Sequence, residues 1–209
     1  EPWSTNFDLW RADATASTGD FDNLTPDNPA WDAGPAFSPD GRTLAYRAMA
    51  RPGFEADRFG VVLRDMETGR TRQVAANWDR SADSLQWSRD GRSLYAVAGD
   101  TGQTKLFSID VNNGMVVAIT GAGHVGGVAQ AEGGFVFARD ALDAPSDLWF
   151  KTYRGRDLPR RLTQANPVLA DRAFGEAEQF SFPGWNDETV HAYVIRPANY
   201  VEGRKYPVA

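Results

Sequence analysis

The sequence contains no cysteine and only two histidines. The absence of cysteine excludes disulfide bonds and thiolate chemistry, but it does not fix the compartment, because an exported protein can do without disulfides. No apolar stretch approaches the roughly 18 residues of a membrane span. No charged segment followed by an apolar one opens the chain, so neither a transmembrane helix nor a signal peptide is expected within these residues.

The chain also lacks an excess of positive charge. Its formal net charge is −6, and no lysine and arginine cluster accompanies aromatic residues, which argues against a nucleic-acid partner. The composition is 42% hydrophobic and 12% aromatic, with 20 glycines. These proportions are typical of a globular protein with a sizeable core and many turns.

A ten-residue pattern occurs twice in the sequence. FSPDGRTLAY occupies residues 37–46, and WSRDGRSLYA occupies residues 87–96. In the first copy Pro39 presets its own φ, Asp40 can bond the nearby backbone, and Gly41 accepts the positive φ that closes a hairpin. Each copy therefore predicts two antiparallel strands joined by a tight turn.

A second hairpin is expected after each copy, over residues 60–74 and 105–120. In both, a strand ends in an aspartate and a glycine closes the turn four residues later. Two hairpins make a four-stranded unit, and the unit recurs at roughly 40–50 residues, which is the period of β-propeller blades. No stretch shows a persuasive helical period, so the predicted fold class is all-β, a partial β-propeller of four-stranded antiparallel blades.

Weaker copies of the template divide the rest of the chain. The expected segments are the outer strands of an incomplete blade (1–30), a blade (31–80), a second blade (81–122), a degenerate blade whose strands include 134–139, 147–151 and 161–163 (123–172), and a connection (173–209). The outer strands of the first segment are expected at 7–11 and 23–25. Because a propeller closes with about four to eight blades, we expect the sequence to be part of a longer chain, or the missing blades to come from elsewhere.

The tail breaks the repeat and carries a family resemblance. Residues 178–182 and 190–195 predict two strands joined by a turn at 186–188, and GRKYPV at 203–208 leads toward a further strand. Together with the two DGR turns and the stretches NWDRS (77–81) and DAPSDLW (143–149), this tail resembles the prolyl oligopeptidase family of serine peptidases, in its acylaminoacyl-peptidase and dipeptidyl-peptidase branch. In that family the corresponding segment joins the propeller to an α/β-hydrolase domain.

The resemblance implies a serine hydrolase that cleaves short peptides, with the propeller as a filter over the active site. The implied partners are a short peptide and the hydrolase domain of the same protein, with a homo-oligomer left open. The catalytic residues would lie beyond residue 209, because this sequence contains no Gly-x-Ser-x-Gly elbow. The family favours a periplasmic or secreted location over a cytoplasmic one. Exopeptidase or endopeptidase action and side-chain specificity stay open.

Local motifs add no cofactor or metal to this interpretation. GAGHVG at 121–126 formally matches a dinucleotide fingerprint, but no helix follows it, so an interblade loop is expected there. His191 lies in an alternating strand without a serine or aspartate at a suitable spacing, which favours a structural role. Asp20, Asp22 and Asp27 lack the ordered ligand spacing of a calcium loop and predict a solvated turn.

The segment with the strongest functional signal is ARPGFEADR, residues 50–58, inserted between the two hairpins of the best-formed blade. In related exopeptidases an acidic group on the propeller binds the free amino terminus of the substrate, and a carboxylate bonds an ammonium strongly. Glu55 is the predicted substrate-binding residue, with Asp57 second. The alternative is that both carboxylates pair with Arg51 and Arg58 on the rim.

A function of another class is a non-enzymatic, protein-binding propeller scaffold. That alternative requires residues 179–208 to form a further blade. Against it, KYPV at 205–208 lacks the aromatic-Ser-x-Asp-Gly pattern with which a blade of this chain begins.

Overall fold

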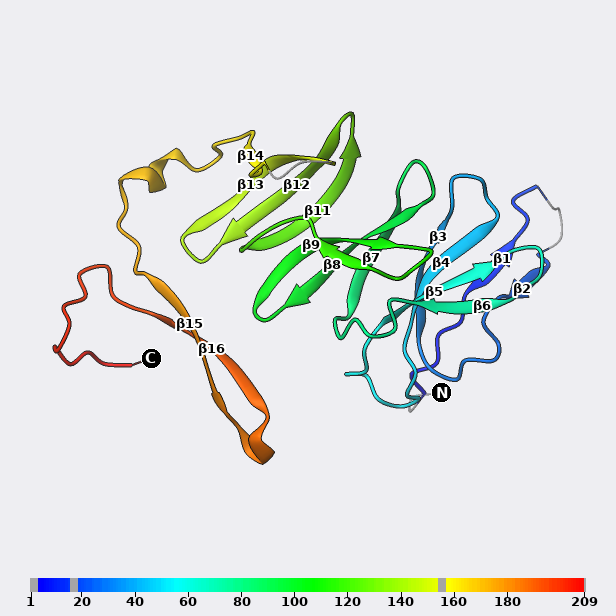
Figure 1. Ribbon diagram of the computed structural model, residues 1–209, viewed down its shortest axis with the longest axis horizontal. Helices are drawn as coiled ribbons and strands as arrows, with labels where there is room; N and C mark the ends of the chain where they lie inside the picture. Colours follow the sequence, from blue (N-terminus) through cyan, green and yellow to red (C-terminus); the bar gives the residue numbers. More distant parts are fainter. Residues whose placement is uncertain (1–3, 16–18, 154–156, 209) are drawn as a thin grey trace. The chain divides into compact units, whose positions relative to one another are not determined.

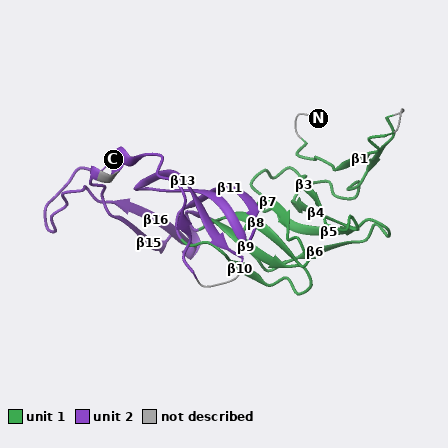
Figure 2. Cartoon of the chain, turned by 90° about the horizontal axis from the view of Figure 1, so that it is seen from above, with its two compact units in different colours: residues 1–100, 105–121 green, residues 101–104, 122–209 purple. Residues whose placement is uncertain are grey.

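The computed structural model describes residues 4–15, 19–153 and 157–208 (Figure 1). Strands dominate, and the described helical segments are two short 3-10 turns, η1 (Pro167–Asp171) and η2 (Trp185–Asp187). The chain forms two compact units, which Figure 2 colours separately: residues 1–100 with 105–121, and residues 101–104 with 122–209. Within the described residues, no helix has the length and apolar character to cross a membrane.

The first four-stranded sheet of unit 1 contains β3 (Asp32–Phe37), β4 (Thr43–Ala48), β5 (Gly60–Asp65) and β6 (Thr71–Val74), in that order and antiparallel. The β3–β4 turn has the chemistry predicted for it. The Ser38 hydroxyl donates to Asp40 Oδ1 at 2.6 Å and accepts the Thr43 N–H at 2.9 Å, while Gly41 has a φ of +71°.

The second sheet of unit 1 repeats this arrangement with β7 (Ala82–Trp87), β8 (Ser93–Asp100), β9 (Gln103–Asp110) and β10 (Val116–Ala118). Its first turn reproduces the bonds of the other copy. The Ser88 hydroxyl donates to Asp90 at 2.7 Å and accepts the Ser93 N–H at 3.0 Å, and Gly91 has a φ of +68°. The local sequence therefore determines this turn at both positions.

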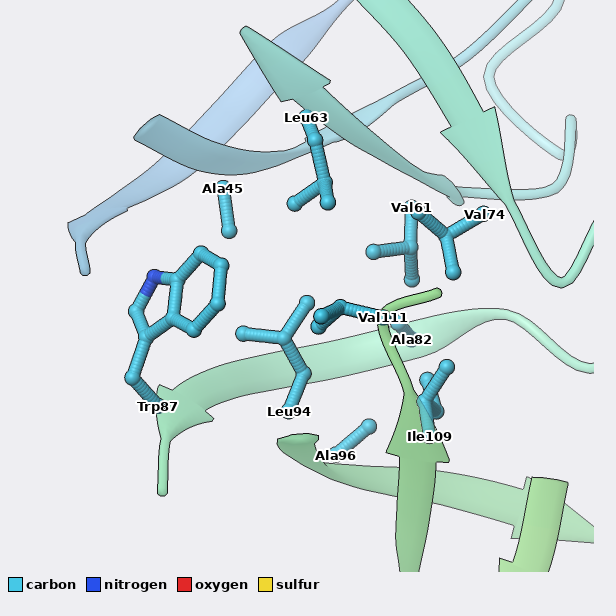
Figure 3. Close-up of a cluster of buried hydrophobic side chains, with 10 residues drawn as sticks. All are labelled: Ala45, Val61, Leu63, Val74, Ala82, Trp87, Leu94, Ala96, Ile109 and Val111. Atoms are coloured by element: carbon cyan, nitrogen blue, oxygen red, sulfur yellow. The ribbon is translucent and has the colours of Figure 1, made fainter. Parts of the chain in front are cut away.

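The hydrophobic core of unit 1 joins the two sheets. Buried apolar side chains stand two residues apart on β5, at Val61 and Leu63, and on β8, at Leu94 and Ala96, so that they share one face of their strand. Trp87 lies at one side of the cluster, and its indole N–H donates to the Ala36 carbonyl at 2.9 Å. The buried cluster, shown in Figure 3, consists of Ala45, Val61, Leu63, Val74, Ala82, Trp87, Leu94, Ala96, Ile109 and Val111.

The first residues of unit 1 pack on the opposite face of the first sheet. Leu9 and Leu24 form a buried cluster with Leu44 and Tyr46 of β4. The antiparallel hairpin expected in this segment is present, but its strands are β1 (Trp10–Ala12) and β2 (Phe21–Asn23) instead of 7–11 and 23–25. Phe7 instead pairs in parallel with Trp31, a non-local contact that no local sequence pattern predicts.

Unit 2 contains four further strands in antiparallel order, β11 (His124–Ala131), β12 (Gly134–Ala141), β13 (Ala144–Thr152) and β14 (Arg160–Arg161). Within the same unit, His124 of β11 pairs in parallel with Thr104 at the start of β9. The prediction of an interblade loop over residues 121–126 is wrong for residues 124–126, because residues 124–131 form the strand β11. The glycines that suggested a loop lie at a register shift between Gly126 and Val128, and Gly127 has a φ of +40°. A β-bulge thus accommodates glycines within a strand.

The tail of unit 2 forms the antiparallel hairpin β15 (Ala177–Pro183) and β16 (Thr189–Ile195) around η2, close to the predicted strands. The Tyr193 hydroxyl donates to the Thr101 carbonyl at 2.9 Å and accepts from Gln103 at 2.8 Å. All residues of β15 are exposed, so this hairpin has little core of its own. The boundaries of the five expected segments stay predictions.

Candidate functional site

The loop between β4 and β5 carries both predicted substrate-binding residues, and Asp57 closes it. Asp57 Oδ2 accepts the backbone N–H groups of Ala50 and Arg51, each at 2.8 Å. Its Oδ1 accepts the Arg51 Nε–H at 2.9 Å. Both oxygens of this carboxylate therefore bind the first residues of the loop to its last ones.

The environment of Asp57 keeps it ionised. Burial of the carboxylate raises its pKa, but the hydrogen bonds from Ala50 and Arg51 outweigh this cost, and the pKa falls to about 2. Hydrogen bonds donated to a charged carboxylate stabilise that form specifically. At neutral pH the charged Asp57 side chain therefore holds the two ends of the loop together through its hydrogen bonds.

Glu55 has a different environment at the tip of the same loop. It is exposed, and it forms no hydrogen bond or ion pair with any residue that the structure describes. Beside it, the Arg51 guanidinium lies over the Phe54 ring, 4.0 Å from the centroid. Arg58 donates to the Trp78 carbonyl at 2.8 Å.

The rim pairing expected as the alternative is therefore present in part. Asp57 pairs with Arg51, whereas Glu55 pairs with neither Arg51 nor Arg58. The tip of the loop presents a free carboxylate next to an aromatic ring. This arrangement can accept hydrogen bonds from a cation such as an ammonium group. The substrate-binding roles of Glu55 and Asp57 stay predictions.

A groove of unit 1 lies at the opposite ends of β4 and β5. It has a volume of about 720 Å³, and Leu63, Trp87 and Val111 line it together with the two Ser-x-Asp-Gly turns. Arg70 and Arg89 also line it, and no sequence motif predicted a functional role for either residue. The only sequence signal for this groove is the repeated turn itself, which we interpreted as structural.

The remaining candidate side chains lie apart from the loop. His124 forms an exposed pair with Asp140 across β11 and β12, with 3.1 Å between Nδ1 and Oδ2. His191 lies opposite Ser181 in the tail hairpin, and Asp22 pairs with Arg11. In the part of the chain that the structure describes, no three acidic, histidine or cysteine residues gather in a group able to hold a metal ion.

Known peptidases are similar to this chain in sequence. No known protein-family profile matches the sequence. Dipeptidyl-peptidase 5 of Porphyromonas gingivalis is 26% identical over 206 residues, which cover 98% of this chain and 30% of that protein. Dipeptidyl-peptidase 5 of Aspergillus fumigatus is 32% identical over 201 residues, 88% of this chain and 27% of that protein.

Solved structures give the same fold. Acylaminoacyl peptidase of Pyrococcus horikoshii matches with a TM-score of 0.68 at 19% identity, over 90% of this chain and 28% of that one. The β-propeller domain of the trilobed protease of Pyrococcus furiosus matches with a TM-score of 0.55 at 14% identity, over 75% of this chain and 44% of that one. At these identities the likeness shows the fold alone.

The four-stranded antiparallel sheets and these structural matches define a partial β-propeller. The matches to the dipeptidyl-peptidase 5 sequences extend over most of the chain. Together they confirm the predicted resemblance of the chain to a propeller segment of the prolyl oligopeptidase family. It spans 25–30% of the length of the curated relatives.

Proposed function

We propose that this chain is the gating and substrate-anchoring propeller segment of a serine exopeptidase that cleaves short peptides. The observation that carries the proposal is the similarity to dipeptidyl-peptidase 5 over 98% of the chain. A peptidase that removes dipeptides must recognise a free amino terminus, which places a positive charge at a fixed distance from the scissile bond. An anchor for that charge improves the alignment of substrate and nucleophile.

We propose Glu55 as this anchor. Its carboxylate is exposed and unpaired, while Asp57 holds the two ends of the same loop together. Phe54, the preceding residue, is 42% exposed and supplies an apolar surface on the same loop. A charged acceptor next to an apolar ring suits the ammonium and the first side chain of a short peptide.

The experiment uses the full-length protein that contains this chain, with dipeptide amides that have either a free or an acetylated amino group. Glu55→Gln is expected to raise KM for the free-amine substrate roughly tenfold, because about 1.4 kcal/mol of binding energy corresponds to that factor. The acetylated substrate lacks the ammonium, so its KM is expected to stay unchanged. Glu67→Gln, in the exposed β5–β6 turn, is the matched control for the loss of one carboxylate.

Two results would overturn parts of this proposal separately. If the protein hydrolyses neither substrate, the peptidase function is wrong, and the protein-binding scaffold becomes the better explanation. If it hydrolyses the free-amine substrate but Glu55→Gln and Glu67→Gln have equal KM values, the peptidase function stands and Glu55 is not the anchor.

A further inference from the structure

Two aspartates of unit 1 come together away from the β4–β5 loop. Asp8 follows Phe7, and Asp32 begins β3 after Trp31. The parallel pairing of Phe7 with Trp31 aligns these two segments, and the Asp32 N–H donates to the Phe7 carbonyl at 2.8 Å. A non-local backbone contact thus places one carboxyl-bearing residue next to another.

Each carboxylate uses one oxygen and leaves the other without a partner. Asp8 Oδ2 accepts from the Asn23 amide at 2.6 Å, and Asp32 Oδ1 accepts from the Asn28 amide at 2.9 Å. Asp8 Oδ1 and Asp32 Oδ2 are buried and have no hydrogen-bond partner among the residues that the structure describes. Asp32 as a whole is only 3% exposed. Buried polar atoms of proteins are nearly always paired, so two orphaned oxygens in one cluster require an explanation.

No positive side chain compensates this cluster. Among the described residues, neither Asp8 nor Asp32 forms an ion pair with a lysine, an arginine or a histidine. Burial raises the pKa of Asp32, the Asn28 amide and the nearby Thr25 side chain oppose this, and the charge of Asp8 raises it further. Burial and then the negative charge of Asp32 raise the pKa of the Tyr46 phenol to about 12, although the positive charge of Arg64 opposes this.

We propose that Asp8 and Asp32 form a binding site for a hard divalent cation of the calcium type. Their two free oxygens point to this class because carboxylate oxygens are its preferred ligands, and one divalent ion neutralises both charges. Zinc is disfavoured, because its sites commonly use cysteine or histidine and unit 1 contains neither residue type. The Asn23 and Asn28 amides orient the two carboxylates from outside, and the Thr25 N–H donates to the Asn23 amide oxygen.

Such an ion has a structural consequence. Asp8 belongs to the segment before β1, and Asp32 belongs to the first strand of the sheet β3–β6. The cation would therefore fasten the first residues of the chain onto this sheet, beside the cluster of Leu9, Leu24, Leu44 and Tyr46. This site does not depend on the proposed peptidase function.

The test measures thermal unfolding of the full-length protein after chelation and dialysis. Calcium chloride is compared with sodium chloride of equal ionic strength. Saturating calcium is expected to raise Tm by about 2–4 °C, because a ligand that binds only the folded state stabilises it. Asp8→Asn and Asp32→Asn are expected to lose this shift. Asp27→Asn, at an exposed residue of the same segment, removes the same charge and is expected to keep the shift.

Each outcome decides the proposal. If calcium leaves Tm of the unaltered protein unchanged, the proposal is wrong, and a proton shared between the two carboxylates is the better explanation. If calcium stabilises all three variants as much as the unaltered protein, the ion binds elsewhere and the proposal is again wrong. If Asp8→Asn and Asp32→Asn do not fold, terbium luminescence of the unaltered protein is measured instead. Terbium emission that is sensitised by tryptophan, and that calcium displaces with a stoichiometry of one ion per chain, would support the site. If no such emission is observed, the proposal is wrong.

Discussion

Asp57 and Asp32 are both poorly exposed aspartates of the same unit, yet their surroundings are opposite. Asp57 receives two backbone N–H groups and the Arg51 side chain, and its pKa falls to about 2. Asp32 receives one amide bond at Oδ1, keeps a buried free oxygen at Oδ2, and has a raised pKa because of its burial. The comparison teaches that donors around a carboxylate can outweigh the cost of its burial, as they do for Asp57 but not for Asp32.

This difference also separates two uses of a carboxylate. Asp57 closes a loop by itself and leaves Glu55 free at the tip. Asp32 lies beside a second acidic residue and has no donor for its remaining oxygen. A carboxylate whose oxygens all accept hydrogen bonds from the protein stabilises the local structure. Two neighbouring carboxylates that each lack a donor for one oxygen favour the binding of a cation or of a proton.

The largest expected change is the removal of the Asp57 carboxylate. Asp57→Ala takes the acceptor away from the backbone of Ala50 and Arg51, and hydrogen bonds to a charged group are worth on the order of 2 kcal/mol. We expect the free energy of unfolding to fall by about that amount, measured by urea denaturation. Glu55→Ala is the control at the unpaired tip and is expected to change it by less than about 0.5 kcal/mol. Equal losses in both variants would contradict the contrast between the two carboxylates.

Low pH removes the negative charge of Asp57 without a substitution. The pKa of Asp57 is lowered from 3.8 to about 2 on folding, so its contribution is complete above the unfolded value and is lost as the pH falls through the folded one. The stability difference between the unaltered protein and Asp57→Ala is therefore expected to shrink from about pH 5 to about pH 2. Urea titrations of both proteins across this window measure it. A difference that stays constant would show that the Asp57 charge contributes nothing to stability.

The smallest expected change in stability concerns the two Ser-x-Asp-Gly turns, in which the hydrogen bonds of the aspartate come from residues close in sequence. Ser38→Ala and Ser88→Ala each remove a buried hydroxyl that bonds one aspartate and one backbone N–H. We expect each variant to lose about 1 kcal/mol of unfolding free energy, the typical net value of a hydrogen bond. Because the two turns have the same geometry, the two losses are expected to agree within about 0.5 kcal/mol. A clear inequality would show that packing around the turn outweighs the turn itself.

Much of the fold follows from short-range sequence signals. The two DGR turns, the strands beside them and the tail hairpin depend on residues close in sequence, and the structure contains all of them. The strand β11 was missed because two adjacent glycines look like a loop, while a β-bulge resolves them within a sheet. At Gly126 and Gly127 the pairing of β11 with β12 outweighs the low strand propensity of glycine.

The candidate site was predictable only in outline. The insertion at residues 50–58 and its two carboxylates were visible in the sequence, and pairing of Asp57 with Arg51 was one of the alternatives. That the backbone of Ala50 also binds Asp57, which leaves Glu55 free, depends on how the loop folds back on itself. The groove beside Arg70 and Arg89 depends on two sheets and carried no separate signal.

The sequence by itself determined the repeated turns, the all-β class and the family resemblance, because each depends on a few neighbouring residues whose backbone preferences are intrinsic. The tertiary structure alone decided the environments of the aspartates. Asp8 and Asp32 are 24 residues apart in sequence, and only the pairing of Phe7 with Trp31 brings them together. Burial and missing donors then give this pair a chemistry that composition and spacing do not contain.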